Sequence, residues 1–161
     1  MNWIVIVDHL PALPEAILLV GACVLMIADT FVKDERRAPT YWIAQGTLAL
    51  CAAATLFVLS VSGLSKYYLF NGLFVADFLS HLVKLVSYGA VSAALVYSRQ
   101  WLVDRSLLRG EFFSLLLFSL LGMMILASAS SFLTVYLGLE LMSLCLYALV
   151  ALNRDSALAT E

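Results

Sequence analysis

The sequence contains few charged residues. Only 12% of its 161 residues are Asp, Glu, Lys or Arg, against roughly 25% in an ordinary soluble domain. Hydrophobic residues make up 63% of the chain, and its mean hydropathy is +1.00. A soluble chain of this length has too little interior to bury so much apolar surface. Because the apolar segments are continuous rather than alternating, we expect an all-α membrane protein.

Motifs for bound groups are also missing. The three cysteines, Cys23, Cys51 and Cys145, match neither a zinc site nor a disulfide framework, and we interpret them as small buried residues. There is no nucleophile motif, phosphate loop, flavin or nicotinamide fingerprint, or iron–sulfur cysteine set. We therefore expect this chain to bind no metal and no cofactor. The net charge of −2, without a basic stripe, argues against nucleic acid as a partner.

Five apolar segments are long enough to cross a bilayer. No Lys or Arg precedes the first of them, which argues against a cleaved signal peptide. The segments form one membrane domain over residues 1–161, with helices predicted at about 13–32, 41–62, 77–98, 111–129 and 132–152.

Basic residues gather on one side of these helices. The segments that follow the second and fourth helices hold only Lys66, and the N-terminal segment holds none. The positive-inside rule therefore predicts an outside N-terminus and an inside C-terminus. The basic residues on the predicted inner side are Lys33, Arg36, Arg37, Arg99, Arg105, Arg109 and Arg154.

A turn signal follows the second helix. Asn71 and Gly72 stand between aromatic and β-branched residues, a pattern typical of a tight hairpin. Either a small β-hairpin on the outer face or an irregular interfacial loop fits this segment.

Glu140 lies in the middle of the apolar run 132–152. A central acidic residue costs about 2.5–3.5 kcal/mol on insertion, and intramembrane charges usually serve function and face protein or water. At 100° per residue, Tyr136, Ser143 and Tyr147 share its face, so we expect this polar stripe to face inward. Gly138 lies nearly opposite, where it would let another helix approach closely. The alternative is a structural glutamate satisfied by serine or tyrosine.

A second polar stripe runs along the third predicted helix. Asp77, His81, Lys84 and Tyr88 follow one another at spacings of four, three and four residues. Lys84 and Glu140 both lie roughly 10–12 Å from the outer ends of their helices, so we predict that Lys84 is a relay partner of Glu140. The alternative is a Lys84 side chain that extends to the outer interface. His81 is a weaker candidate for proton transfer, and no second ligand supports a metal site.

Three stretches carry a family resemblance: 113–128, 133–150 and 154–161. They resemble the antiporter-like subunits of the proton-pumping NADH:quinone oxidoreductase (respiratory complex I), and among these the subunit N family. A looser match covers the whole chain. The resemblance implies that Glu140 corresponds to the proton-pathway glutamate on the fifth helix of the family. It also implies a bacterial inner (cytoplasmic) membrane location and other membrane subunits as partners. NADH, FMN, iron–sulfur clusters and quinone would be bound elsewhere in the complex.

The chain is shorter than the family pattern. Members have about fourteen helices built around two inverted five-helix repeats, and the lysine that partners the helix-five glutamate lies on helix seven, beyond Glu161. We therefore expect an N-terminal fragment, and a fragment would not pump protons. Two other functions remain open, namely a subunit of an Mrp-type Na⁺/H⁺ antiporter and a non-catalytic five-helix membrane scaffold.

Overall fold

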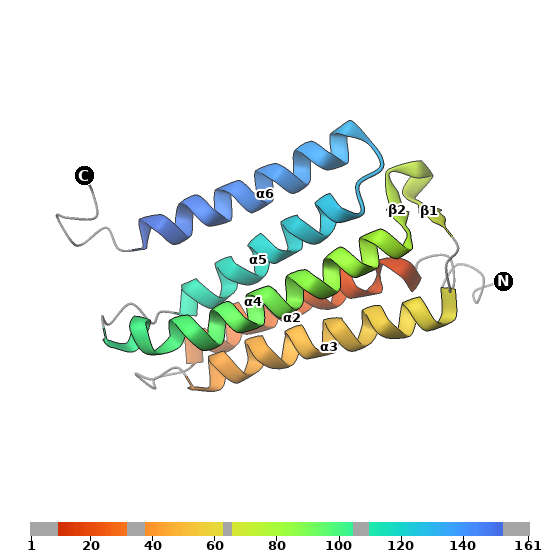
Figure 1. Cartoon of the computed structure of the whole chain (residues 1–161). Helices are drawn as coiled ribbons and strands as arrows, with labels where there is room; N and C mark the ends of the chain where they lie inside the picture. The colour runs from red at the N-terminus through yellow and green to blue at the C-terminus, as the bar shows by residue number, and fades with distance from the viewer. Residues whose placement is uncertain (1–9, 32–37, 63–65, 105–109, 153–161) are drawn as a thin grey trace.

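A computed structural model describes residues 10–31, 38–62, 66–104 and 110–152. Five long helices run roughly side by side (Figure 1), as expected for an all-α membrane protein. They are preceded by a short 3-10 helix, η1, at Leu10–Ala12. The long helices are α2 (Leu13–Phe31), α3 (Ala38–Ser62), α4 (Phe78–Asp104), α5 (Gly110–Ala127) and α6 (Phe132–Ala151).

Each of the five helices contains a window long and apolar enough to cross a membrane. The first turn of α2 contains Pro14 and Glu15, two residue types that suit the start of a helix. A proline there removes no helical hydrogen bond, and a carboxylate is stabilised by the positive end of the helix dipole. The ends of α3 and α4 extend beyond the predicted ranges. Helix α3 begins at Ala38 rather than at residue 41, and α4 ends at Asp104 rather than at residue 98.

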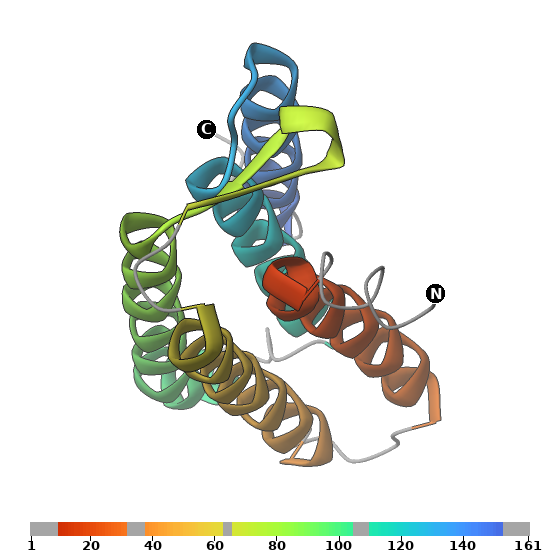
Figure 2. The same ribbon diagram turned by 90° about the vertical axis from the view of Figure 1, so that its right-hand side faces the viewer.

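Helix α5 lies at the centre of the arrangement and α6 at its edge. Half of the most apolar window of α5 is buried (50%), against 11% for α6. Figure 2 shows the reason: α5 lies between α6 and the group formed by α2, α3 and α4. The core therefore forms around α5, with Leu18, Leu25, Leu48, Leu95, Phe113, Leu117, Leu120 and Met124 among its most buried side chains.

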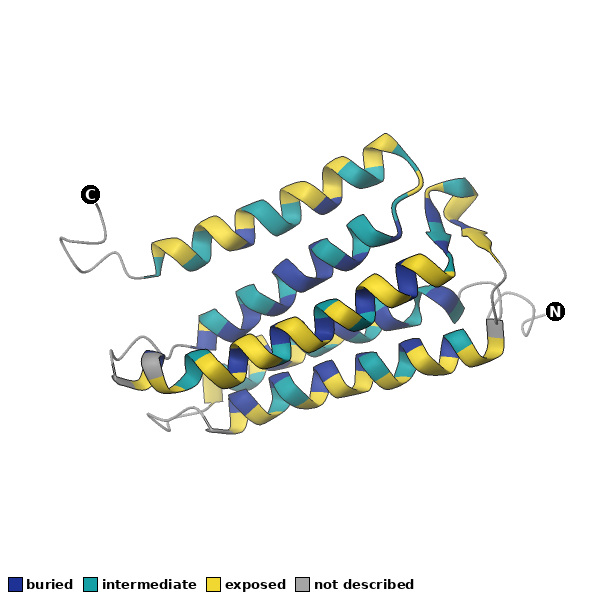
Figure 3. Ribbon diagram, viewed as in Figure 1, coloured by how far each residue is buried: buried dark blue, intermediate teal, exposed yellow. Residues whose placement is uncertain are grey.

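The outward faces of the helices are largely apolar. Figure 3 shows exposed positions along the outside of every long helix, and many of them carry large apolar side chains, such as Val20, Leu56 and Val96. This distribution suits lipid rather than water as the surrounding medium. The chain is thus a multi-pass membrane protein.

A small antiparallel hairpin closes one end of the bundle. Strand β1 (Tyr67–Leu69) pairs with β2 (Phe74–Ala76), and Leu69 is opposite Phe74. Between the strands lies η2 (Phe70–Gly72), where Asn71 has φ 56° and Gly72 has φ 85°. The Asn-Gly signal thus forms a hairpin, and the irregular loop is excluded. We call this end of the bundle the hairpin end.

The hairpin is bonded to the turn between α5 and α6. The Val75 amide donates to the Ser128 carbonyl at 2.8 Å, and the Ser130 amide donates to the Leu73 carbonyl at 3.1 Å. Phe74 also forms an isolated bridge with Ala129. The hairpin therefore connects the start of α4 with the α5–α6 turn, although these segments are far apart in sequence.

Candidate functional site

The carboxylate of Glu140 lies on the outward side of α6. Glu140 is the ninth residue of this helix and is exposed. Tyr136 and Tyr147 on the same stripe are 54% and 71% exposed. Among the described residues, no hydrogen-bond or ion-pair partner reaches the Glu140 carboxylate. The stripe exists as predicted, but it does not face the other helices of this chain, because α6 packs mainly on α5 through its opposite side.

That opposite side is formed around Gly138. A Cβ atom on Gly138 would lie 3.1 Å from both the Gly122 carbonyl oxygen and the Leu126 amide nitrogen of α5. The prediction that Gly138 permits a close helix approach is therefore confirmed. This packing fixes the rotation of α6 about its axis and consequently turns Glu140 outward.

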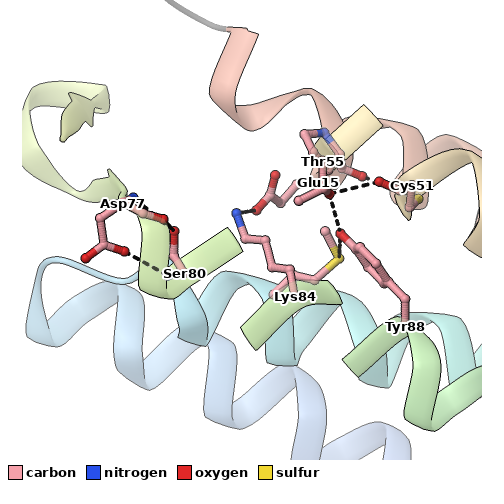
Figure 4. A network of polar contacts seen from close by, with 9 residues as sticks. Glu15, Cys51, Thr55, Asp77, Ser80, Lys84 and Tyr88 are labelled. Carbon is pink, nitrogen blue, oxygen red and sulfur yellow. Dashed lines mark hydrogen bonds and ion pairs between the residues drawn. The ribbon is translucent and has the colours of Figure 1, made fainter. Parts of the chain in front are cut away.

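A different pair of charges lies inside the bundle. The Lys84 ammonium nitrogen of α4 is 2.5 Å from Oε1 of Glu15 on α2. The Lys84 side chain is 0% exposed and that of Glu15 is 12% exposed. Figure 4 shows the two side chains, one from α2 and one from α4, pointing towards each other. The Lys84 ammonium also lies 5.0 Å from the centre of the Phe74 ring, a distance at which a cation is attracted to an aromatic face.

This arrangement changes the predicted role of Lys84. The long side chain does not extend to the outer interface, because its ammonium group is fully buried. Its charged contact is Glu15 rather than Glu140. We predicted a pairing of Lys84 with Glu140 because both residues lie at the same depth in their helices. Equal depth, however, does not determine which helix faces contact each other. A relay role for Lys84 stays a prediction.

The remaining members of the α4 stripe divide into two groups. His81, Lys84 and Tyr88 are all buried on the inner face. Asp77 precedes the helix and caps it, because its Oδ1 accepts a hydrogen bond from the Ser80 amide at 2.8 Å and its own amide donates to the Ser80 hydroxyl oxygen at 3.1 Å. The Asp77 side chain therefore satisfies one of the free amides at the start of α4.

Polar contacts continue one turn deeper from Lys84 (Figure 4). The Tyr88 hydroxyl lies 3.3 Å from the Thr55 hydroxyl of α3 and 3.5 Å from the Met124 sulfur of α5. The Thr55 hydroxyl donates to the Cys51 carbonyl at 2.8 Å, and the Cys51 thiol lies 3.7 Å from the Pro14 carbonyl of α2. Together these contacts connect α2, α3, α4 and α5 at the level of the ion pair.

Two features of the sequence are consistent with the Glu15–Lys84 site. Glu15 is an acid within a long apolar run at the hairpin end, and Lys84 is a base on the inner face of its helix. The position of Glu15 in the first turn of α2 also suits the helix dipole. Its side chain points into the bundle towards Lys84, and this direction depends on how α2 packs on α3 and α5.

Metal binding finds no support in the described parts of the chain, where no group of three or more His, Cys, Asp or Glu side chains could hold an ion. The three cysteines are free thiols, and Cys51 and Cys145 are buried. Six of the basic residues that contribute to the predicted orientation lie outside the described residues, namely Lys33, Arg36, Arg37, Arg105, Arg109 and Arg154.

Comparison with known proteins identifies close relatives. No family model matches the chain. A protein of Nitrosomonas europaea named NADH-quinone oxidoreductase subunit N is 49% identical over 154 residues, covering 96% of this chain and 31% of the relative. Proteins of the same name are 46% identical in Laribacter hongkongensis, over 100% of this chain and 32% of the relative, and 51% identical in Thiobacillus denitrificans, over 94% of this chain and 31% of the relative.

The similarity extends over nearly the whole chain, and the chain spans about one third of the length of these curated relatives. The chain is therefore homologous to an N-terminal part of the NADH-quinone oxidoreductase subunit N proteins.

Proposed function

We propose that this chain is part of a proton-translocating membrane subunit of NADH:quinone oxidoreductase. The names of the relatives support this assignment, together with the 45–51% identity across most of the chain. The observation that carries the proposal is the position of Glu140. It is an ionisable side chain in the middle of an apolar membrane helix, exposed on the side of α6 away from α5.

Glu140 takes up and releases protons in this proposal. Its stripe supplies further hydroxyl groups from Tyr136, Ser143 and Tyr147, which can hydrogen-bond to water along the same helix face. The Ser143 hydroxyl donates to the Leu139 carbonyl in its own helix, so its oxygen remains an acceptor towards the Glu140 side. An outward stripe of this kind is suited to contact with further protein, because a carboxylate left in lipid is costly.

The chemistry of electron transfer belongs to other parts of the complex. NADH, FMN, iron–sulfur clusters and quinone are bound by other subunits, and quinone reduction there changes the protonation of buried Glu and Lys residues here. The partners of this chain are the other membrane subunits. Its location is the bacterial inner membrane, with the hairpin end outside, as the distribution of basic residues predicts.

The test uses the full-length protein in the assembled complex, in membrane vesicles. Glu140→Gln keeps the size and hydrogen-bonding capacity of the side chain but removes its charge. We expect proton uptake per NADH oxidised to fall severalfold while the amount of complex stays unchanged. Glu111→Gln is the matched control, because Glu111 is an exposed carboxylate in the first turn of α5.

Unchanged pumping in a fully assembled Glu140→Gln complex would overturn the proposal and favour a scaffold role. A pH response of the vesicles that depends on Na⁺, without NADH oxidation, would instead identify an antiporter.

A further inference from the structure

Buried polar atoms without a hydrogen-bond partner gather at one place in the described chain. They are both carboxylate oxygens of Glu15, Nδ1 of His81, Nζ of Lys84 and Oγ of Ser128. Three of these four residues lie on α2 and α4 near the hairpin end. Ser128 follows α5 at the same end, where its carbonyl accepts a hydrogen bond from β2.

The ion pair does not use the full bonding capacity of these groups. An ammonium group has three donors, a carboxylate has about four acceptor sites, and a neutral imidazole has one of each. The Lys84–Glu15 contact joins a single nitrogen with a single oxygen. Buried charges that are incompletely bonded cost several kcal/mol, and such groups are usually satisfied by ordered water. We therefore expect water to bind between Glu15, Lys84 and His81.

The ionisable groups form a line that leads from the hairpin end into the bundle. Asp77 caps α4 at that end and is half-buried, His81 follows one turn later, and Lys84 follows after three more residues. His81 follows Asp77 by four residues and precedes Lys84 by three, a spacing that places these side chains next to one another on one helix face. His81 thus lies between the surface of the bundle and the ion pair.

Several other side chains pack around the ion pair. The Phe74 ring of β2 covers the ammonium. The Cys51 thiol of α3 lies against the carbonyl of Pro14, the residue before Glu15, and the Tyr88 hydroxyl is occupied by Thr55 and Met124. Among the described residues, Met124 of α5 and Ser128, which follows α5, contribute no charge here.

We propose that Glu15, Lys84 and His81 form a second proton-exchange site, separate from Glu140 and connected to the hairpin end through His81. A proton taken up by the His81 imidazole passes through bound water to a Glu15 oxygen. The carboxylate becomes a carboxylic acid, the imidazole returns to its neutral form, and Lys84 remains an ammonium group. The net charge of the Glu15–Lys84 pair changes from zero to +1, and the reverse transfer restores it. Any contribution of this exchange to pumping rests on the proposed function, but the exchange itself does not.

The experiment is an infrared difference titration of the full-length protein in the assembled complex. We expect a carboxylic acid band that grows as the pH falls and is lost in Glu15→Gln. The Glu111→Gln control keeps the band. In His81→Asn, which retains a buried polar side chain that cannot be protonated, we expect the band to follow a pH jump at least severalfold more slowly.

If Glu15→Gln fails to assemble because it leaves Lys84 unpaired, the neutral double variant Glu15→Gln/Lys84→Met takes its place and must also lose the band. A band that persists in these variants, or a His81→Asn protein that responds as fast as the wild type, would overturn the proposal. Pumping that survives Glu140→Gln while the Glu15 band is present would refute the proposed function alone. Reduced pumping in Glu140→Gln without any Glu15 band would refute this second site alone.

Discussion

Gly122 on α5 and Gly138 on α6 bring the backbones of the two helices into direct contact. A Cβ atom on Gly122 would lie 2.9 Å from the Gly138 carbonyl oxygen and 2.7 Å from the Met142 amide nitrogen. Both neighbours are backbone atoms, which cannot rotate away as a flexible side chain does. The close approach of these helices therefore depends on the absence of a side chain at both positions.

We predict that Gly122→Leu separates α5 from α6. Overpacking of this kind costs about 1–3 kcal/mol or more, and it should lower both the Tm in detergent and the yield of assembled full-length protein. Gly89→Leu is the control, because a Cβ atom on Gly89 in α4 meets nothing within 4 Å. Equal Tm values for the two variants would contradict the close packing of α5 on α6.

The Glu15–Lys84 pair gives a second prediction, which concerns stability rather than proton exchange. Lys84→Met leaves the Glu15 carboxylate without its counter-charge, and the loss of one partner of a buried pair costs about 3–5 kcal/mol. The double variant Glu15→Gln/Lys84→Met should recover most of this loss. The measurement is the free energy of unfolding of the purified full-length protein in detergent. A double variant no more stable than Lys84→Met would show that the pair is not a unit.

A third prediction compares the two carboxylates as partners of Lys84. The described structure joins Lys84 to Glu15, whereas Glu140 lies on the outward side of α6. A double-mutant cycle between Lys84 and Glu140 should therefore be additive to within about 0.5 kcal/mol, while the cycle between Lys84 and Glu15 should show coupling of about 0.5–3 kcal/mol. A larger coupling energy between Lys84 and Glu140 than between Lys84 and Glu15 would contradict this prediction and support Glu140 as the partner of Lys84.

Tyr88→Phe tests the polar contacts beneath the ion pair. The substitution removes the hydroxyl that lies between Thr55 and Met124, and we expect a loss of about 0.5–1.5 kcal/mol. Tyr97→Phe in the same helix is the control, since Tyr97 is 90% exposed and should change the Tm little. If both variants melt at the wild-type temperature, the Tyr88 hydroxyl does not stabilise the bundle.

The hairpin turn provides a backbone test. Gly72 has φ +85°, and the space around its would-be Cβ is empty, so Gly72→Ala is strained by conformation alone. A left-handed conformation costs an L-residue about 1–2 kcal/mol. Asn71→Gly, at φ 56°, should be neutral or slightly stabilising. Proteolysis of full-length protein in vesicles would report the difference as faster cleavage near residue 72 in Gly72→Ala only.

Much of the fold could be predicted because membrane helices are recognisable in a sequence by the length and hydropathy of their apolar segments. The five spans follow from continuous apolar runs, and the hairpin follows from the backbone preferences of Asn71 and Gly72. The packing role of Gly138 was also predictable, since helical geometry places it opposite Glu140.

The pairing of buried charges was not predictable in the same way. Helical periodicity gives the face on which a side chain lies, but not which helix that face meets. Lys84 meets α2 because α4 packs on α3 and α5 with its inner face turned towards Glu15. The outward direction of Glu140 likewise follows from contacts between α5 and α6, which no single-helix pattern contains.

The connection between β2 and the α5–α6 turn has a consequence for the order of synthesis. Strand β2 leaves the ribosome about fifty residues before Ser128 and Ser130 (128 − 76 = 52). Until those residues emerge, the Val75 amide and the Leu73 carbonyl lack the partners that they have in the finished structure. The outer edge of the hairpin is therefore completed only after α5 has been translated.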